Sequence, residues 1–308
     1  MSTSLRRTVT FAGPASPALA LAPLRRGPGD PCLQVHDGAF WRTSLMPSGP
    51  VTARISRSAT EAVGCEAWGA GAEEFLDAAP GLLGAHDVAT DFVPTDPTVA
   101  AAHRRVPHLR LGRTGRVLEA LVPAVLEQRV PGADAFRAWR VLVTEFGSAA
   151  PGPAPAGMRV PPSAQTWQAI PSWKFHLANV DGGRARTIVG CARRASALER
   201  LVARPPAEAR AALMSLPGVG EWTAAETAQR AFGDADALSV GDYHLATMIG
   251  RTLRGLPLDA LFTDADMVTL MEPMRPHRHR VVRLLIESGL AVSKRRGARL
   301  PVQRISAL

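Results

Sequence analysis

The first hundred residues alternate short apolar runs with clusters of glycine and proline. The runs have the length and the β-branched or aromatic content of strands, at 8–11, 32–35, 39–45 and 51–55. Residues 73–83 show helical spacing instead, and Thr95, Asp96 and Pro97 are typical of a helix N-terminus, so a helix is expected over 94–102. We therefore predict a small α+β unit over residues 1–100, and no catalytic set of residues stands out in it.

From residue 117 onward the pattern changes to that of amphipathic helices. In the segment 117–129, the apolar residues from Leu118 to Leu126 recur on one helical face. Similar spacing predicts further helices at 136–146, 165–169, 175–178, 184–195, 207–216, 222–232, 243–253 and 279–289. The segment 148–162, rich in Ala, Gly and Pro, is interpreted as an exposed connection. A mainly α protein is predicted, with a helical domain over 101–292 and a basic tail over 293–308.

The distribution of charge along the chain indicates the kind of partner that the protein binds. The chain has 308 residues and a net charge of +9, and Lys174 and Lys294 are its two lysines. A GC-rich genome explains the preference for arginine but not the position of the charge. Residues 1–110 are neutral, whereas eight basic residues and the single acidic Glu287 lie between Arg275 and Arg299. Such an excess attracts polyanions and favours nucleic acid.

Several classes of protein and site are excluded or disfavoured. No apolar run reaches the roughly 18 residues of a membrane span, so a cytoplasmic protein is expected. Cys32, Cys65 and Cys191 are scattered and too few for a four-thiolate zinc or iron–sulfur site. The sequence patterns of phosphate-binding P-loops, zinc proteases and zinc deaminases do not occur.

The segment Leu216-Pro217-Gly218-Val219-Gly220 lies between two amphipathic helices. Its glycines permit a tight turn and leave amides uncovered at the N-terminus of the second helix, where an anion is favoured. This pattern predicts a helix–hairpin–helix that grips DNA phosphates, with an ordinary helix–helix turn as the alternative. Asp242 follows at the start of the next helix, where an N-cap is the alternative to a catalytic role.

With these two features the sequence resembles the helix–hairpin–helix DNA glycosylases, in particular the bacterial AlkA-type 3-methyladenine glycosylases. The stretches 118–130, 183–188 and 272–276 agree with the same family, so the resemblance covers about residues 100–290. It implies that a small antiparallel sheet precedes the helical domain. It also implies that Asp242 is the catalytic aspartate and that the amides of Gly218, Val219 and Gly220 bind a DNA phosphate. No metal or redox cofactor is implied, although a monovalent cation can accompany such a hairpin.

The resemblance also assigns the remaining site residues. Family members that also cleave the DNA backbone have a lysine at the position of Trp222, so a monofunctional enzyme acting on damaged duplex DNA as a monomer is expected. Trp222, Glu226 and Tyr243 are expected to line the base pocket, although Glu226 replaces an aromatic residue. A second pocket aromatic is replaced by Ile286. Arg129 takes the place of the residue that wedges into the duplex.

Two alternatives to this function stay open: a glycosylase of the same fold with another damaged base as substrate, and a non-catalytic DNA-binding protein. Asp242 favours the enzyme over the binding protein, which has no need of the carboxylate. The remaining histidines and tryptophans are given structural interpretations. We expect His277 and His279 to be solvated or phosphate-facing, and His244 to be a surface or packing residue. Trp139, Trp167 and Trp173 are expected in the core. The basic residues 294–299 either contact DNA or are solvated.

Overall fold

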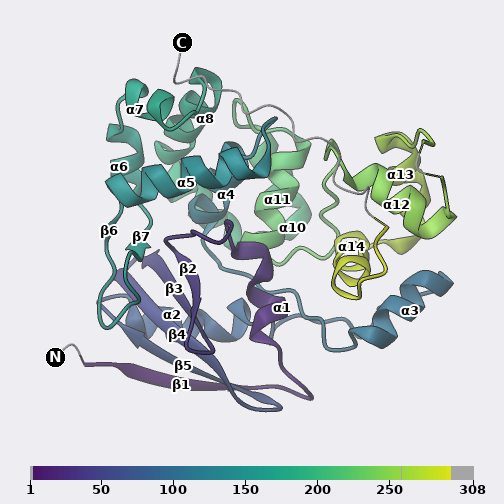
Figure 1. Ribbon diagram of the computed structural model, residues 1–308, viewed down its shortest axis with the longest axis horizontal. Coiled ribbons are helices and arrows are strands. Elements are labelled where there is room, and N and C mark those ends of the chain that lie inside the picture. Colours follow the sequence, from purple (N-terminus) through teal and green to yellow (C-terminus); the bar gives the residue numbers. More distant parts are fainter. Residues whose placement is uncertain (1–2, 258, 293–308) are drawn as a thin grey trace.

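The computed structural model describes residues 3–257 and 259–292, and its N-terminal part contains a five-stranded antiparallel sheet (Figure 1). The strand order is β1–β5–β4–β3–β2. The strands are β1 (Leu5–Thr10), β2 (Leu33–His36), β3 (Ala39–Met46), β4 (Gly49–Ala59) and β5 (Ala62–Trp68). Four of them were predicted, whereas β5 was missed because Gly64 and Glu66 interrupt its apolar pattern.

Helix α2 (Ala72–Leu82) packs on one face of this sheet against β1, β4 and β5, with the short helix α1 (Pro17–Leu21) beside it. The other face is covered by a hairpin of β6 (Ser148–Ala149) and β7 (Arg159–Val160). Met158 of this hairpin is buried against Trp41 and Trp68, and the Thr43 hydroxyl donates to the Arg159 carbonyl at 2.5 Å. The prediction of an exposed connection over 148–162 was therefore wrong, because part of the segment closes a core.

A second layer of the molecule is a bundle of helices around α4 (Val117–Leu126), whose ten residues are nearly all buried. Helix α4 packs against α5, α8, α9 and α11. The bundle consists of α5 (Gly132–Phe146), α6 (Ala164–Ala169), α7 (Ser172–Leu177), α8 (Gly182–Ala192), α9 (Ala195–Glu199), α10 (Pro206–Met214) and α11 (Glu221–Ala231). Short 3₁₀ turns at Ala22–Leu24, Arg200–Ala203 and Glu272–Met274 complete the local structure. Trp139 and Trp167 lie in this core as predicted, whereas Trp173 is 55% exposed.

A third group of helices has its own core and lies on the other side of α11 (Figure 1). It contains α12 (Leu245–Arg254), α13 (Asp264–Met271) and α14 (Arg278–Glu287), together with α3 (Pro97–Arg105), which packs against α14. Helix α13 was not predicted, although Thr263 and Asp266 form a capping box at its start. Helix α3 extends across residue 100, where the boundary between the two domains was expected. The division into domains at that residue stays a prediction. Among the described residues, no helix is long and apolar enough to cross a membrane.

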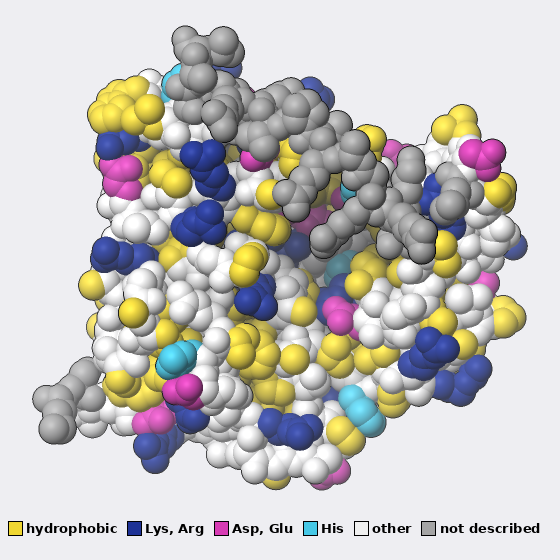
Figure 2. Space-filling model, viewed as in Figure 1, with side chains coloured by type: hydrophobic (Ala, Val, Ile, Leu, Met, Phe, Trp, Pro, Cys, Tyr) yellow, Lys and Arg dark blue, Asp and Glu magenta, His cyan; other side chains and the backbone are white. Residues whose placement is uncertain are grey.

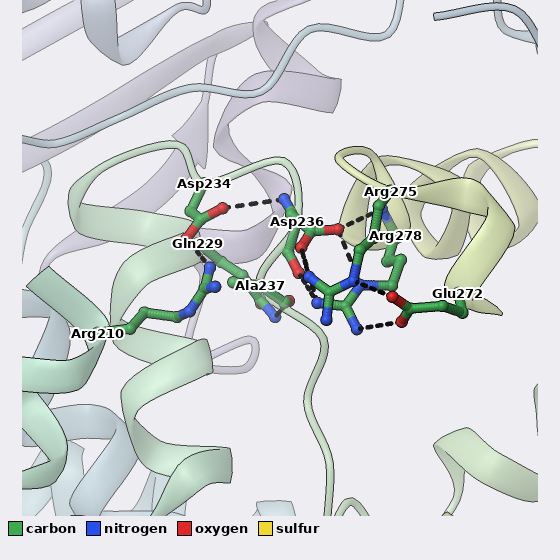
Figure 3. Close-up of polar contacts among 8 residues, drawn as sticks. All are labelled: Arg210, Gln229, Asp234, Asp236, Ala237, Glu272, Arg275 and Arg278. Atoms are coloured by element: carbon green, nitrogen blue, oxygen red, sulfur yellow. Dashed lines mark hydrogen bonds and ion pairs between the residues drawn. The ribbon is translucent and has the colours of Figure 1, made fainter. Parts of the chain in front are cut away.

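The three arginines of α14 are largely buried, contrary to expectation. Arg278 donates twice to the Asp236 carboxylate, and Arg275 pairs with the same carboxylate at 2.7 Å (Figure 3). Arg280 likewise pairs with Asp87 at 2.6 Å, and both side chains are buried. His277 and His279, predicted to be solvated or phosphate-facing, are only 6% and 7% exposed. Much of the described excess of positive charge is therefore neutralised by carboxylates from earlier in the chain; the predicted tail 293–308 lies outside the described residues.

Candidate functional site

The turn between α10 and α11 is built on two glycines that have different surroundings. Gly218 has φ +83°, and a β-carbon placed there would lie 2.0 Å from the Thr187 hydroxyl oxygen of α8. Nothing lies within 4 Å of the corresponding position at Gly220. Gly218 is therefore required by close packing inside the molecule, whereas Gly220 leaves open space on the outer side of the turn.

The turn presents backbone amides at the start of α11. The Val219 amide, one of the three predicted to bind phosphate, donates to the Leu216 carbonyl at 3.0 Å, and its side chain is buried. The amides of Gly218 and Gly220 have no acceptor among the described residues. Both lie beside the N-terminus of α11, where the helix dipole adds to their attraction for an anion.

Asp242 lies in the loop before α12 and uses both of its carboxylate oxygens. Oδ1 accepts from the backbone amides of His244 at 2.8 Å and Leu245 at 2.9 Å, which closes the turn that leads into the helix. Oδ2 accepts from the indole nitrogen of Trp222 at 3.3 Å. Asp242 is therefore not the N-cap residue itself, which is His244, but its Oδ1 holds the turn before the helix and so fixes the direction of Oδ2.

Helix α11 holds the Asp242 loop through a series of side chains. The Gln229 amide donates at 2.8 Å both to the Ala237 carbonyl and to the Ser239 hydroxyl, and Ser239 in turn donates to Glu226 at 2.6 Å. Trp222, at the start of the same helix, donates a hydrogen bond to Asp242 itself. Because the hairpin begins the same helix, the glycine-rich turn and the carboxylate share one rigid support.

The other expected pocket residues are placed differently. Tyr243 follows Asp242 directly, but its side chain is 82% exposed and meets His244 edge to face at 4.8 Å between ring centroids. His244 is exposed as expected. Ile286 is 49% exposed on α14. Of the residues named for the pocket, Trp222 and Glu226 are therefore the two that line the same face of α11.

Glu226 belongs to a buried network of charges. Its carboxylate pairs with Arg230 at 2.7 Å, and Arg26 pairs nearby with Glu127 at 2.7 Å. Burial acts to raise the pKa of Glu226, but the Arg230 guanidinium, the Ser239 hydroxyl and Arg26 outweigh this effect and lower the pKa. The Glu226 side chain is therefore ionised at neutral pH and acts as a hydrogen-bond acceptor.

Arg129 lies at the exposed tip of the loop after α4, with φ +55°. The neighbouring Gln128 anchors this loop to the hairpin, because its side-chain amide donates to the Gly218 carbonyl at 2.9 Å and to the Thr223 hydroxyl at 2.8 Å. Arg184 of α8 also donates to the Leu126 carbonyl at 2.7 Å. Gln128 and Arg184 lie within stretches that carried the family resemblance, but the sequence did not indicate what they contact.

The face shown in Figure 2 is hollowed between the bundle around α11 and the helices α12–α14, and basic, acidic and histidine side chains are visible in the hollow. Lys174, the one lysine among the described residues, lies elsewhere: it pairs with Glu145 of α5 and its ammonium lies 4.6 Å from the centre of the Trp173 ring. No amine nucleophile from the described part of the chain is therefore placed beside Asp242.

A helical bundle with a glycine-rich hairpin and a preceding antiparallel sheet is the fold of the helix–hairpin–helix DNA glycosylases, and this molecule has that fold. Two solved structures share it over 93% of this chain. The 3-methyladenine DNA glycosylase of Archaeoglobus fulgidus matches over its whole length with a TM-score of 0.74 and 17% identity. The 8-oxoguanine glycosylase/lyase of Clostridium acetobutylicum matches over 98% of its length with a TM-score of 0.71 and 12% identity.

Within this class the chain is similar in sequence to AlkA. It is 29% identical over 241 residues to a probable bifunctional transcriptional activator and DNA repair enzyme AlkA of Mycobacterium tuberculosis. The alignment covers 73% of this chain and 46% of the relative, so the chain spans about half the length of the curated relatives it matches. No family model matches the chain.

Proposed function

We propose that the protein is a monofunctional DNA glycosylase of base excision repair, which removes alkylated purines from duplex DNA and leaves an abasic site. The observation that carries the proposal is the placement of Asp242. Its carboxylate is oriented by two backbone amides and one indole, and the helix that supplies the indole, α11, begins at a hairpin with two unoccupied amides. The AlkA relative, described as a DNA repair enzyme, and the named 3-methyladenine glycosylase support the substrate class.

DNA binding would begin at the hairpin. The amides of Gly218 and Gly220 hold one phosphate without reading sequence, and Arg129 enters the duplex at the position vacated by the extruded nucleotide. A monovalent cation at the hairpin, which the resemblance allows, would add to this contact, because the carbonyls of Leu216 and Gly218 each keep a lone pair beside the hydrogen bond they accept. The protein would act as a monomer on double-stranded DNA in the cytoplasm.

The chemistry follows from a fixed negative charge beside the sugar. As the bond from C1′ to the base nitrogen breaks, its electron pair leaves with the base and positive charge develops on the sugar ring. The Asp242 carboxylate stabilises that charge, and it accepts a proton as a water molecule attacks C1′. Because Trp222 takes the place of a lysine, no Schiff base forms and the DNA backbone stays intact.

The direct test is base release from methylated duplex DNA by the purified protein. We expect free methylated purines, with strand breaks that appear only after alkali treatment, and no covalent complex on addition of borohydride. Strand cleavage without alkali, or a trapped covalent complex, would contradict the monofunctional mechanism. Binding of the DNA without release of any methylated base would contradict the proposed function.

A further inference from the structure

Three residues of α11 follow one another at a spacing of four, namely Trp222, Glu226 and Arg230. Residues so spaced lie on one helical face, about one turn of 5.4 Å apart. The first of them contacts Asp242, and the second contacts Ser239 of the same loop. A base whose sugar lies at Asp242 and whose ring lies along Trp222 would therefore direct its far edge toward Glu226.

The carboxylate of Glu226 is held in one orientation. Its Oε1 accepts from Ser239 at 2.6 Å, and its Oε2 accepts from Arg230 at 2.7 Å. A carboxylate has about four acceptor positions, so each oxygen keeps roughly one for a further donor. The side chain is 13% exposed, so a small part of it remains accessible while most of it is buried.

The carboxylate of Glu226 can accept hydrogen bonds from a bound base, and the base need not carry a positive charge. Arg230 pairs with the carboxylate directly and Arg26 lies close by, so the site is compensated before any ligand enters. The Tyr243 ring, which would have to stack on a second face of the base, is exposed to solvent instead. Recognition at this site therefore depends more on hydrogen bonds than on two aromatic faces.

We propose that Glu226 selects guanine-derived lesions, an inference that rests on the proposed function and narrows its substrate class. Guanine-type bases carry two adjacent N–H donors, the ring N1–H and the exocyclic amino group, on the edge opposite the sugar. These two donors match the two remaining acceptor positions of the fixed carboxylate. Adenine-type bases place an acceptor nitrogen beside their amino group, and its lone pair is repelled by the carboxylate.

The test uses one substrate, methylated duplex DNA that contains both 7-methylguanine and 3-methyladenine. The release of each base is measured as a fraction of the amount present and corrected for spontaneous loss. We expect the unmodified protein to favour 7-methylguanine, and Glu226→Gln to lower the release of 7-methylguanine relative to 3-methyladenine by roughly tenfold, because one charge-assisted acceptor is lost.

A matched control is Glu119→Gln. Glu119 is also a mostly buried glutamate that accepts from an arginine and a serine, Arg42 and Ser44, but it lies on α4 and contacts the sheet. We expect this variant to leave the ratio of released bases unchanged. An equal shift in both variants, or a preference of the unmodified protein for 3-methyladenine, would overturn the role of Glu226.

A second measurement needs neither hydrolysis nor a variant. Duplexes with one 2′-fluorinated, non-hydrolysable nucleotide of guanine or adenine type should differ in affinity, with the guanine type bound more tightly by roughly tenfold. If no methylated base is released, the proposed function fails while this comparison still decides the inference. Equal affinity for the two duplexes would overturn it.

Discussion

At Arg129 the backbone adopts a left-handed conformation that costs an L-residue about 1 kcal/mol or more. The conformation persists because its neighbours are fixed: Glu127 pairs with Arg26, and Gln128 binds the hairpin. The sequence indicated Arg129 as the expected wedge residue through a resemblance, but not these anchors, because Arg26 and Gly218 are about a hundred residues away in the chain. Strain at an exposed, anchored tip is typical of a functional residue.

Two substitutions separate this strain from the side chain itself. Arg129→Gly and Arg129→Ala both remove the guanidinium, but only glycine adopts the left-handed conformation without cost. We expect the Gly variant to be more stable than the Ala variant by about 1 kcal/mol, as measured by chemical denaturation. Both should release damaged bases more slowly than the unmodified protein. Equal stability of the two variants would show that the backbone relaxes at this position.

At the scale of elements, the hairpin was the most predictable part of the molecule. Its two glycines and the amphipathic helices on both sides are local features, and α10 and α11 begin and end within two residues of the predicted ranges. What the local pattern did not reveal is that the two glycines serve different purposes. Thr187, which lies against Gly218, comes from α8 and is known only from the packing.

Substituting each glycine by alanine tests this difference. Gly218→Ala combines a contact of 2.0 Å with a positive φ, so we expect a loss of stability of about 2 kcal/mol or more. Gly220→Ala meets no neighbour and has φ −92°, so its melting temperature should change little. The added methyl group should instead hinder a phosphate and weaken duplex binding by roughly tenfold. A Gly220→Ala variant with unchanged DNA affinity would contradict the phosphate contact.

At the scale of the whole molecule, charge and burial could not be predicted from the sequence. The excess of basic residues over 275–299 predicted an interaction with nucleic acid, but several of those in 275–283 pair with Asp87 and Asp236 inside the structure. A count of charges does not reveal which carboxylates approach in space. The histidine between them is affected most: burial, together with Arg283, Arg230 and Arg280, lowers the pKa of His279 well below its usual value.

This shift makes the stability of the protein depend on pH. In the unfolded chain His279 gains a proton below about pH 6.5, whereas in the folded protein it stays neutral to lower pH, so stability is lost as the pH falls. We expect the free energy of unfolding to decrease toward pH 5.5 by up to about 1.4 kcal/mol per pH unit from this residue. His279→Gln should flatten that slope. An unchanged slope in the variant would assign the pH dependence to other groups.

The central claim concerns the Asp242 carboxylate, and single-turnover base release by Asp242→Asn tests it most directly. Asparagine accepts hydrogen bonds from backbone amides at the start of a helix as well as aspartate does, so the fold should be retained. Asp96→Asn is the matched control, because Asp96 accepts from the amides two and three residues ahead in the same way at the start of α3. We expect Asp242→Asn to slow release by roughly a hundredfold or more while Asp96→Asn releases the bases normally. Release by Asp242→Asn at the rate of the unmodified protein would contradict the account.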